Sequence, residues 1–282
     1  MTVRIVTDST CDLPRELVER YGIIVVPLTV IFGEEALLDG VDIDAEQFYR
    51  RLAASKVLPR TSQPSVEQFA AAYRQAFQAG ADAVLSIHIS SKLSGTLNAA
   101  RIAAAEVAAE AGRQIELLDS KNVSLGLGAV VLAAAERAVT GADLASVLAV
   151  ATATIDAVHV VCVVDTLEYL QRGGRIGRAR SMLGTLLNVK PLIHVEDGEV
   201  APFDRVRTRA RALERLAEFV REHRGASRLF VACAGNDGET EAFIERVRPD
   251  LPGTEIIRGH IGPIVGVYTG PNTLGVCPVM PV

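Results

Sequence analysis

The sequence contains no tryptophan, only 5% aromatic residues and only four cysteines among 282 residues. These cysteines are Cys11, Cys162, Cys233 and Cys277, and no two of them have CxxC spacing. We therefore expect reduced, structural thiols, with neither a disulfide framework nor a metal site. The chain also lacks a basic excess, since its formal net charge is −5. This charge argues against a nucleic-acid partner.

Long uninterrupted hydrophobic segments are absent as well. Arg4 interrupts the apolar run where a secretory signal would need its hydrophobic segment, so we expect a cytoplasmic protein. The strongest membrane candidate is residues 147–164, but Asp156 and His159 interrupt it. We therefore predict no integral membrane segment.

The residues that are abundant predict a globular α/β protein. Hydrophobic residues make up 49% of the chain and charged residues 22%, which is enough to build a sizeable core. Short β-branched runs alternate with polar turns and Ala-rich amphipathic stretches, which is typical of βαβ units. We predict two α/β domains with a ligand cleft between them. Residues 1–155 would hold a largely parallel sheet with flanking helices, and residues 156–282 a mixed α/β domain.

The pattern also predicts individual elements. In the first half, strands are expected at 4–6, 23–32, 83–89 and 115–118, and helices at 14–21, 44–55, 65–79 and 97–111. Helices at 123–139 and 144–155 and a strand at 158–164 follow. Beyond these we expect strands at 192–195, 199–202, 229–232, 255–257 and 264–268, and a helix at 208–223.

Two loops rich in hydroxyl groups are candidate anion sites. Residues 90–96 include Ser94 and Gly95, and lie between a predicted strand and a predicted helix, where open α/β folds bind ligands. Residues 60–65 include Thr61 and Ser62 and precede the helix that leads into the same strand. If the loops face each other, Thr61 and Ser94 could share one ligand oxygen. Both segments are equally compatible with ordinary helix capping.

Other polar motifs point to weaker alternatives. Asp8 could act as the nucleophile in phosphoryl transfer, but Thr10 stands where a haloacid-type phosphatase has its second aspartate. A turn with Asp12 capping the next helix needs no further assumption. Ser94 and His260 could form a serine hydrolase pair, although Lys92 stands where a nucleophile elbow has its first glycine.

Residues 172–178 contain Arg172, Arg175 and Arg178 between glycines. They match neither GxGxxG nor a P-loop, so nucleotide binding is not supported. These arginines could contact a carboxylate or phosphate, or form a solvated turn.

Six motifs in series resemble those of the DegV family and occur in the family's order. They are TDSTCDLP (7–14), TSQPS (61–65), SSKLSGT (90–96), DTLEYL with GGRI (165–170 and 173–176), KP (190–191) and GHIG (259–262). The resemblance implies a protein that binds one long-chain fatty acid, such as palmitate or oleate. The carboxylate would lie in the interdomain cleft and the tail in the C-terminal domain.

By the same resemblance, Thr61 and Ser94 would hold the carboxylate, with Ser62, Gly95 and His260 close by. No catalytic residue, metal or cofactor is implied besides the bound lipid. In bacteria with a fatty-acid kinase, such proteins present the bound acid for phosphorylation. The chain has no nucleotide loop, so such a kinase would be a separate protein. The cluster with Arg172 and Arg175 is basic on an otherwise acidic protein, and complementary charge can orient a partner, so we expect the kinase to dock there.

Overall fold

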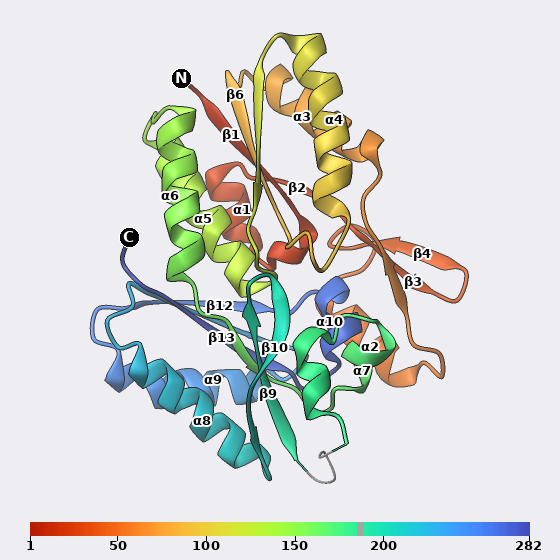
Figure 1. The fold of residues 1–282 in the computed structure, drawn as a ribbon, viewed down its shortest axis with the longest axis vertical. Coiled ribbons are helices and arrows are strands. Elements are labelled where there is room, and N and C mark those ends of the chain that lie inside the picture. Colours follow the sequence, from red (N-terminus) through yellow and green to blue (C-terminus); the bar gives the residue numbers. More distant parts are fainter. Residues whose placement is uncertain (185–188) are drawn as a thin grey trace.

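The computed structural model describes residues 1–184 and 189–282, which form two α/β layers stacked end to end (Figure 1). The N-terminal sheet has the order β2-β1-β6-β7, and every pair in it is parallel. Its strands are β1 (Val3–Asp8), β2 (Ile24–Val26), β6 (Ala83–His88) and β7 (Gln114–Asp119). The predicted parallel sheet of the first half is confirmed.

Helices cover both faces of this sheet because the strands are apolar on both sides. Val6 and Val84 pack against α3 (Val66–Gln78) and α4 (Thr96–Ala111). Ile5 and Leu85, one position along each strand, lie in the hydrophobic cluster that includes α5 (Leu125–Val139) and α6 (Leu144–Ala157). The short helix α1 (Arg15–Tyr21) packs on this second side. The alternation of side-chain direction along β1 and β6 therefore places helices on both faces of this sheet.

The C-terminal half is α/β, as predicted, and its sheet mixes parallel and antiparallel pairs in the order β10-β9-β8-β13-β11-β12. Only β11 and β12 pair in parallel among its described strands. The strands are β8 (Val161–Val163), β9 (Lys190–Glu196), β10 (Glu199–Val206), β11 (Arg228–Cys233), β12 (Glu255–His260) and β13 (Leu274–Val279). One face packs on α8 (Arg209–Glu222) and α9 (Asp237–Val247), and the other faces α5 of the first layer.

A third, small sheet lies beside the junction of the two layers (Figure 1). Its order is β4-β3-β5, from β3 (Thr29–Phe32), β4 (Glu35–Leu38) and β5 (Arg60–Ser62). It lies with α2 (Ala45–Ala54) against α10 (Pro263–Thr269), which comes from the far end of the chain. The helix α7 (Glu168–Arg172) and the 3-10 helix at Gly177–Met182 complete this side. The boundary at residues 155/156 stays a prediction.

Two of the predicted elements were wrong. The single strand expected at 23–32 is divided into β2 and β3, which belong to different sheets, because Pro27 lacks the N–H that a continuous ladder needs. The segment 264–268 is the helix α10 rather than a strand. Pro263 occupies its first turn, where proline favours a helix, and burial of residues 264–267 in succession hid the helical period. The strands β4, β5 and β13 and the helices α7 and α9 were not predicted.

The acidic motif after β1 is structural. Asp8 is fully buried and accepts hydrogen bonds from the Thr10 and Ile89 N–H groups. Its Oδ2 atom also lies 3.0 Å from Nδ1 of His88, whose Nε2 is 2.7 Å from the Ser86 hydroxyl. A carboxylate so enclosed is inaccessible to a phosphoryl donor.

Asp12 does not cap α1, contrary to the prediction. The helix begins after Pro14 without a side-chain cap. The Asp12 carboxylate instead accepts hydrogen bonds from the N–H of Gly262 at 3.0 Å and from the Ser124 hydroxyl. It therefore connects the first layer to the loop between β12 and α10.

Among the residues that the structure describes, no helix is both long and apolar enough to cross a membrane.

Candidate functional site

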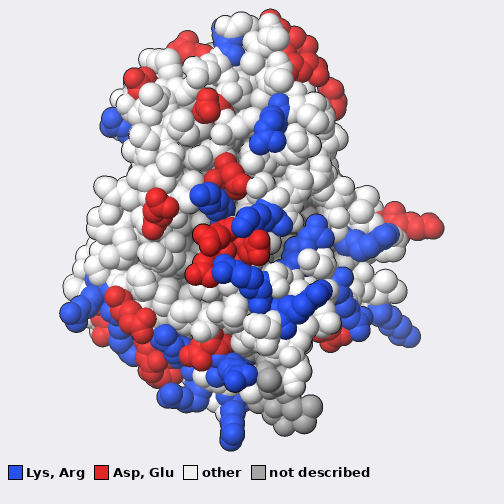
Figure 2. Space-filling view, viewed as in Figure 1, with Lys and Arg blue, Asp and Glu red and all other residues white. Residues whose placement is uncertain are grey.

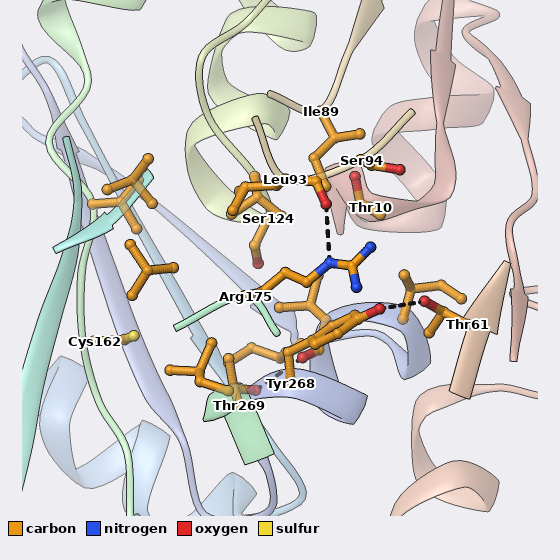
Figure 3. A pocket seen from close by; sticks show the side chains of 18 of the residues that line it. Thr10, Thr61, Ile89, Leu93, Ser94, Ser124, Cys162, Arg175, Tyr268 and Thr269 are labelled. Carbon is orange, nitrogen blue, oxygen red and sulfur yellow. Dashed lines mark hydrogen bonds between the residues drawn. The ribbon is translucent and has the colours of Figure 1, made fainter. Parts of the chain in front are cut away.

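A cavity of about 330 Å³ lies where the two layers meet the small third sheet (Figure 3). Its walls come from the loops after β5 and β6, from α5 and α10, and from β8, β9 and β10 of the C-terminal sheet. This volume is within the usual range for small-molecule sites. The position also matches the predicted cleft between the two α/β units.

One end of the cavity carries hydroxyl groups from three distant segments. Thr61 of β5 lies with its Oγ1 atom 2.6 Å from the Tyr268 hydroxyl of α10. Ser94, after β6, has its Oγ atom 2.8 Å from the Thr96 hydroxyl at the start of α4. All of these oxygens can donate or accept a hydrogen bond, so together they can solvate a small anion without a fixed positive charge.

Gly95 allows the two hydroxyl loops to approach each other. A Cβ atom at this position would overlap the side-chain amide of Gln63, which comes from the loop after β5. The prediction that the two loops face one cleft is consistent with this contact, and Thr61, Ser62, Ser94 and Gly95 all line the cavity.

Arg175 brings a positive charge to the same end. Its Nε donates to the Leu93 carbonyl at 3.2 Å and its Nη1 to the Gly173 carbonyl at 2.8 Å. The guanidinium lies over the Tyr268 ring, 5.2 Å from the centroid. Figure 3 shows it between Leu93 and Tyr268, where it lines the cavity. Among the described residues no carboxylate forms an ion pair with Arg175.

The neighbouring arginines are arranged differently. Arg172 forms an ion pair with Glu168 at 2.5 Å, and Arg178 with Glu196 at 2.8 Å. Neither residue lines the cavity. On the face that Figure 2 draws, acidic and basic side chains lie side by side, so that face carries both signs of charge. Arg175 is thus the arginine of the turn whose charge is available to a ligand in the cavity.

The other end of the cavity is mainly apolar, although His194, Thr269 and Thr273 also line the cavity. Its walls include Leu125, Val160, Ile193, Val195 and Val200, from α5, the segment before β8, and strands β9 and β10. Cys162 of β8 also lines this end, away from Thr61 and Ser94 in Figure 3. Burial raises the pKa of its thiol to about 12, so it is a neutral, weakly polar group at physiological pH.

His260 lies outside this cavity. It is the last residue of β12, and its Nδ1 atom is 3.5 Å from Asp237 of α9. The Ser94 hydroxyl contacts Thr96 instead, so Ser94 and His260 do not form the hydrogen-bonded pair that a serine hydrolase requires. The structure brings together Thr61, Ser94 and Arg175, and leaves His260 and Arg172 apart.

The sequence analysis did not identify Tyr268 and Cys162 as residues of the cavity. Tyr268 was overlooked because its segment was predicted to be a strand, whereas it lies in α10 with its hydroxyl beside Thr61. Cys162 was interpreted as a structural thiol, and no local signal separates it from the buried Cys277. Pro263 after a glycine could have indicated the helix, and with it the position of Tyr268.

Comparison with known proteins identifies the family of this chain. Residues 2–280 match the model of the DegV family, which is described as a family of uncharacterised proteins. A DegV domain-containing protein of Deinococcus radiodurans is 41% identical over 280 residues, covering 98% of each chain. Two solved structures superpose over nearly the entire chain.

The first of these structures is a DegV family protein from Thermus thermophilus, described as fatty acid binding. It is 36% identical, with a TM-score of 0.90 and complete coverage of both chains. The second, from Eubacterium ventriosum, is described as a stearic acid-binding protein. It is 27% identical with a TM-score of 0.91, covering 99% of this chain and 98% of the other.

Proposed function

This chain belongs to the DegV family, and on that premise we propose that it binds one long-chain fatty acid, such as palmitate or oleate. The carboxylate would lie at the end with Thr61, Ser94 and Arg175, and the tail at the apolar end beside Cys162. The relatives described as fatty acid binding support the ligand class. The observation that carries the proposal is the uneven polarity of the cavity, which has hydroxyl groups and Arg175 at one end and mainly aliphatic walls beyond them.

The two ends would contribute differently to the affinity. Burying roughly 14 methylenes at about 0.8 kcal/mol each gives on the order of 10 kcal/mol before the cost of ordering the chain. A carboxylate leaving water needs donors, which the hydroxyls of Thr61, Ser94 and Tyr268 can supply. The tail would therefore provide most of the affinity, and the head group would set the orientation.

We propose a binding protein for lipid transport or fatty acid metabolism rather than an enzyme. The hydrolase alternative has no support in the geometry, because the Ser94 hydroxyl and the His260 ring contact other residues. Activation of the bound acid would need a separate ATP-using kinase, since the sequence has no nucleotide-binding loop. The cytoplasmic location expected from the sequence remains a prediction.

The role of the arginine turn is refined by its contacts. We propose that Arg172 and Arg175 face a kinase partner, and that the positive charge of Arg175 also attracts the carboxylate of the bound acid. These two roles make different predictions. Charge reversal at Arg172 would reduce phosphorylation of the bound acid and leave its affinity unchanged. Replacement of Arg175 by methionine would weaken binding of the acid more than binding of the corresponding fatty alcohol.

The test begins with the purified protein. Organic extraction followed by mass spectrometry should find about one fatty acid per chain. The double variant Thr61→Val, Ser94→Ala should then bind palmitate more weakly by roughly 1–3 kcal/mol, or about fivefold to 150-fold, because the carboxylate loses satisfied donors. Thr140→Val, which removes an exposed hydroxyl outside the cavity, is the matched control.

Two outcomes would contradict the proposal. Absence of extractable lipid together with no binding of added palmitate or oleate would exclude the ligand class. Unchanged palmitate affinity in a folded double variant would place the carboxylate elsewhere. An adduct of Ser94 with a fluorophosphonate would instead favour the hydrolase.

A further inference from the structure

Three side chains of the kind that bind metals meet outside the cavity, at the carboxyl ends of two parallel strands. Cys233 is the last residue of β11 and His260 the last residue of β12, and the two are register partners in this strand pair. Asp237 begins α9, the helix that follows β11. The topology therefore places these residues together, although 27 positions separate the first from the last in the sequence.

The distances suit tetrahedral coordination. Oδ1 of Asp237 lies 3.5 Å from the Cys233 Sγ atom and 3.5 Å from Nδ1 of His260. All three ligand atoms lie within 4.8 Å of one another. Bonds of about 2.0–2.3 Å at tetrahedral angles put the ligands of zinc roughly 3.5 Å apart. The three atoms thus need only small side-chain adjustments to share one ion.

From this geometry we propose that Cys233, Asp237 and His260 form a binding site for a divalent transition metal, of which zinc is the best match. Thiolate and imidazole ligands favour zinc over magnesium or calcium, which prefer oxygen ligands only. The ion would bind sulfur as the Cys233 thiol releases its proton to solvent, and would bind the neutral imidazole at Nδ1. Water would fill the fourth position.

A positive charge lies beside the three proposed ligands. Arg258 of β12 places Nη2 2.8 Å from Oδ1 of Asp237 and Nε 2.9 Å from Oε1 of Glu241. Its guanidinium therefore neutralises the carboxylate that the metal would use. When a cation binds Asp237, Arg258 keeps Glu241 as its partner. Arg258 acts in this scheme as a competitor for the metal.

Access to the site is open from solvent. The side chains of His260 and Asp237 are 50% and 60% exposed, whereas Cys233 is buried beneath them. An ion can enter between the two exposed ligands and reach the sulfur. The site lies outside the fatty-acid cavity, although Ile261, the next residue after His260, is part of the cavity wall. Metal binding and fatty-acid binding can therefore be measured separately.

The test is a cobalt titration of the intact, chelator-treated protein, with zinc as competitor. Cobalt should bind once per chain, with near-ultraviolet absorption from a cobalt–thiolate bond and intense visible bands typical of tetrahedral geometry, and zinc should abolish both. Cys233→Ser should remove the near-ultraviolet band. Asp237→Asn and His260→Gln should each weaken cobalt binding by about tenfold or more. Arg258→Gln should strengthen it, since it removes the competing charge.

Control variants separate this site from other thiols and histidines. Cys277→Ala and His223→Gln, which change residues outside the cluster, should leave the cobalt spectrum unchanged. Circular dichroism and palmitate binding verify that each variant is folded. The proposal is overturned if the parent protein shows no cobalt–thiolate band, if the band persists in Cys233→Ser, or if zinc fails to displace the cobalt.

Discussion

The position of the fatty-acid tail can be tested by filling the apolar end of the cavity. Cys162 on β8 is suited to this test because it lines that end, away from the hydroxyl groups of Thr61 and Ser94 (Figure 3). Opposite it lies Gly275 of β13, where an added Cβ atom would be 3.5 Å from Cβ of Cys162. This glycine leaves room for a larger side chain at position 162. We therefore consider the variant Cys162→Phe.

The expected loss follows from the methylenes that the ring displaces. If the phenyl group takes the place of about four methylenes, palmitate loses about 3 kcal/mol at about 0.8 kcal/mol for each. That corresponds to an affinity about 200-fold weaker. Laurate, whose shorter tail would not reach this end, should bind with nearly unchanged affinity. The perturbation therefore predicts a change in chain-length selectivity rather than a uniform loss.

The assay is displacement of a fluorescent fatty acid by saturated acids of increasing length. Cys162→Val, which is close to cysteine in volume, is the matched control and should retain the selectivity of the parent protein. Thermal unfolding of both variants shows whether the strand tolerates the change. Equal weakening of laurate and palmitate would refute the proposed orientation, and unchanged binding of both would place the tail outside this end of the cavity.

Three further predictions concern stability and the shape of the site. Burial raises the pKa of Asp39 to about 7 from its ordinary 3.8, so the folded state holds this proton more tightly than the unfolded state. The stability of the parent protein should therefore fall as the pH rises from about 4 to 7, because Asp39 loses its proton over this range. Urea midpoints should fall less with pH in Asp39→Asn, and an equal fall in both proteins would show that Asp39 is not the titrating group. Gly95→Val should weaken palmitate binding by forcing the side chain of Gln63 aside, and Gln63→Ala should restore part of the affinity; absence of rescue would contradict this contact. Arg228 pairs through two nitrogens with Glu136, both at 2.7 Å, and thereby links β11 to α5. Arg228→Ala should cost roughly 1–3 kcal/mol in urea denaturation, and Glu136→Gln added to it should cost little more, whereas additive losses would mean that the pair is not coupled.

The local sequence determined the N-terminal layer and the place of the hydroxyl loops. Short segments such as residues 83–89 are rich in aliphatic and β-branched residues, and Ala-rich helices follow them, so the type of each segment is visible within a short window. Parallel strands place their carboxyl ends at one edge of a sheet, and this is why Ser94 could be expected at a ligand site. The predictions that Thr61 and Ser94 belong to one cleft rested on this topological rule and on the family resemblance.

Tertiary structure decided the features that depend on distant segments. The apolar run that is buried at residues 264–267 resembles a strand in the sequence, and this hid the contact between Tyr268 of α10 and Thr61. Glu168, four residues before Arg172, is a local ion-pair partner, but only the folded chain brings Arg175 to the cavity, beside Leu93 and Tyr268. Whether a polar side chain faces a cavity, a partner or solvent depends on which elements pack beside it. No local pattern contains that information, because the elements that decide it lie far away in the chain.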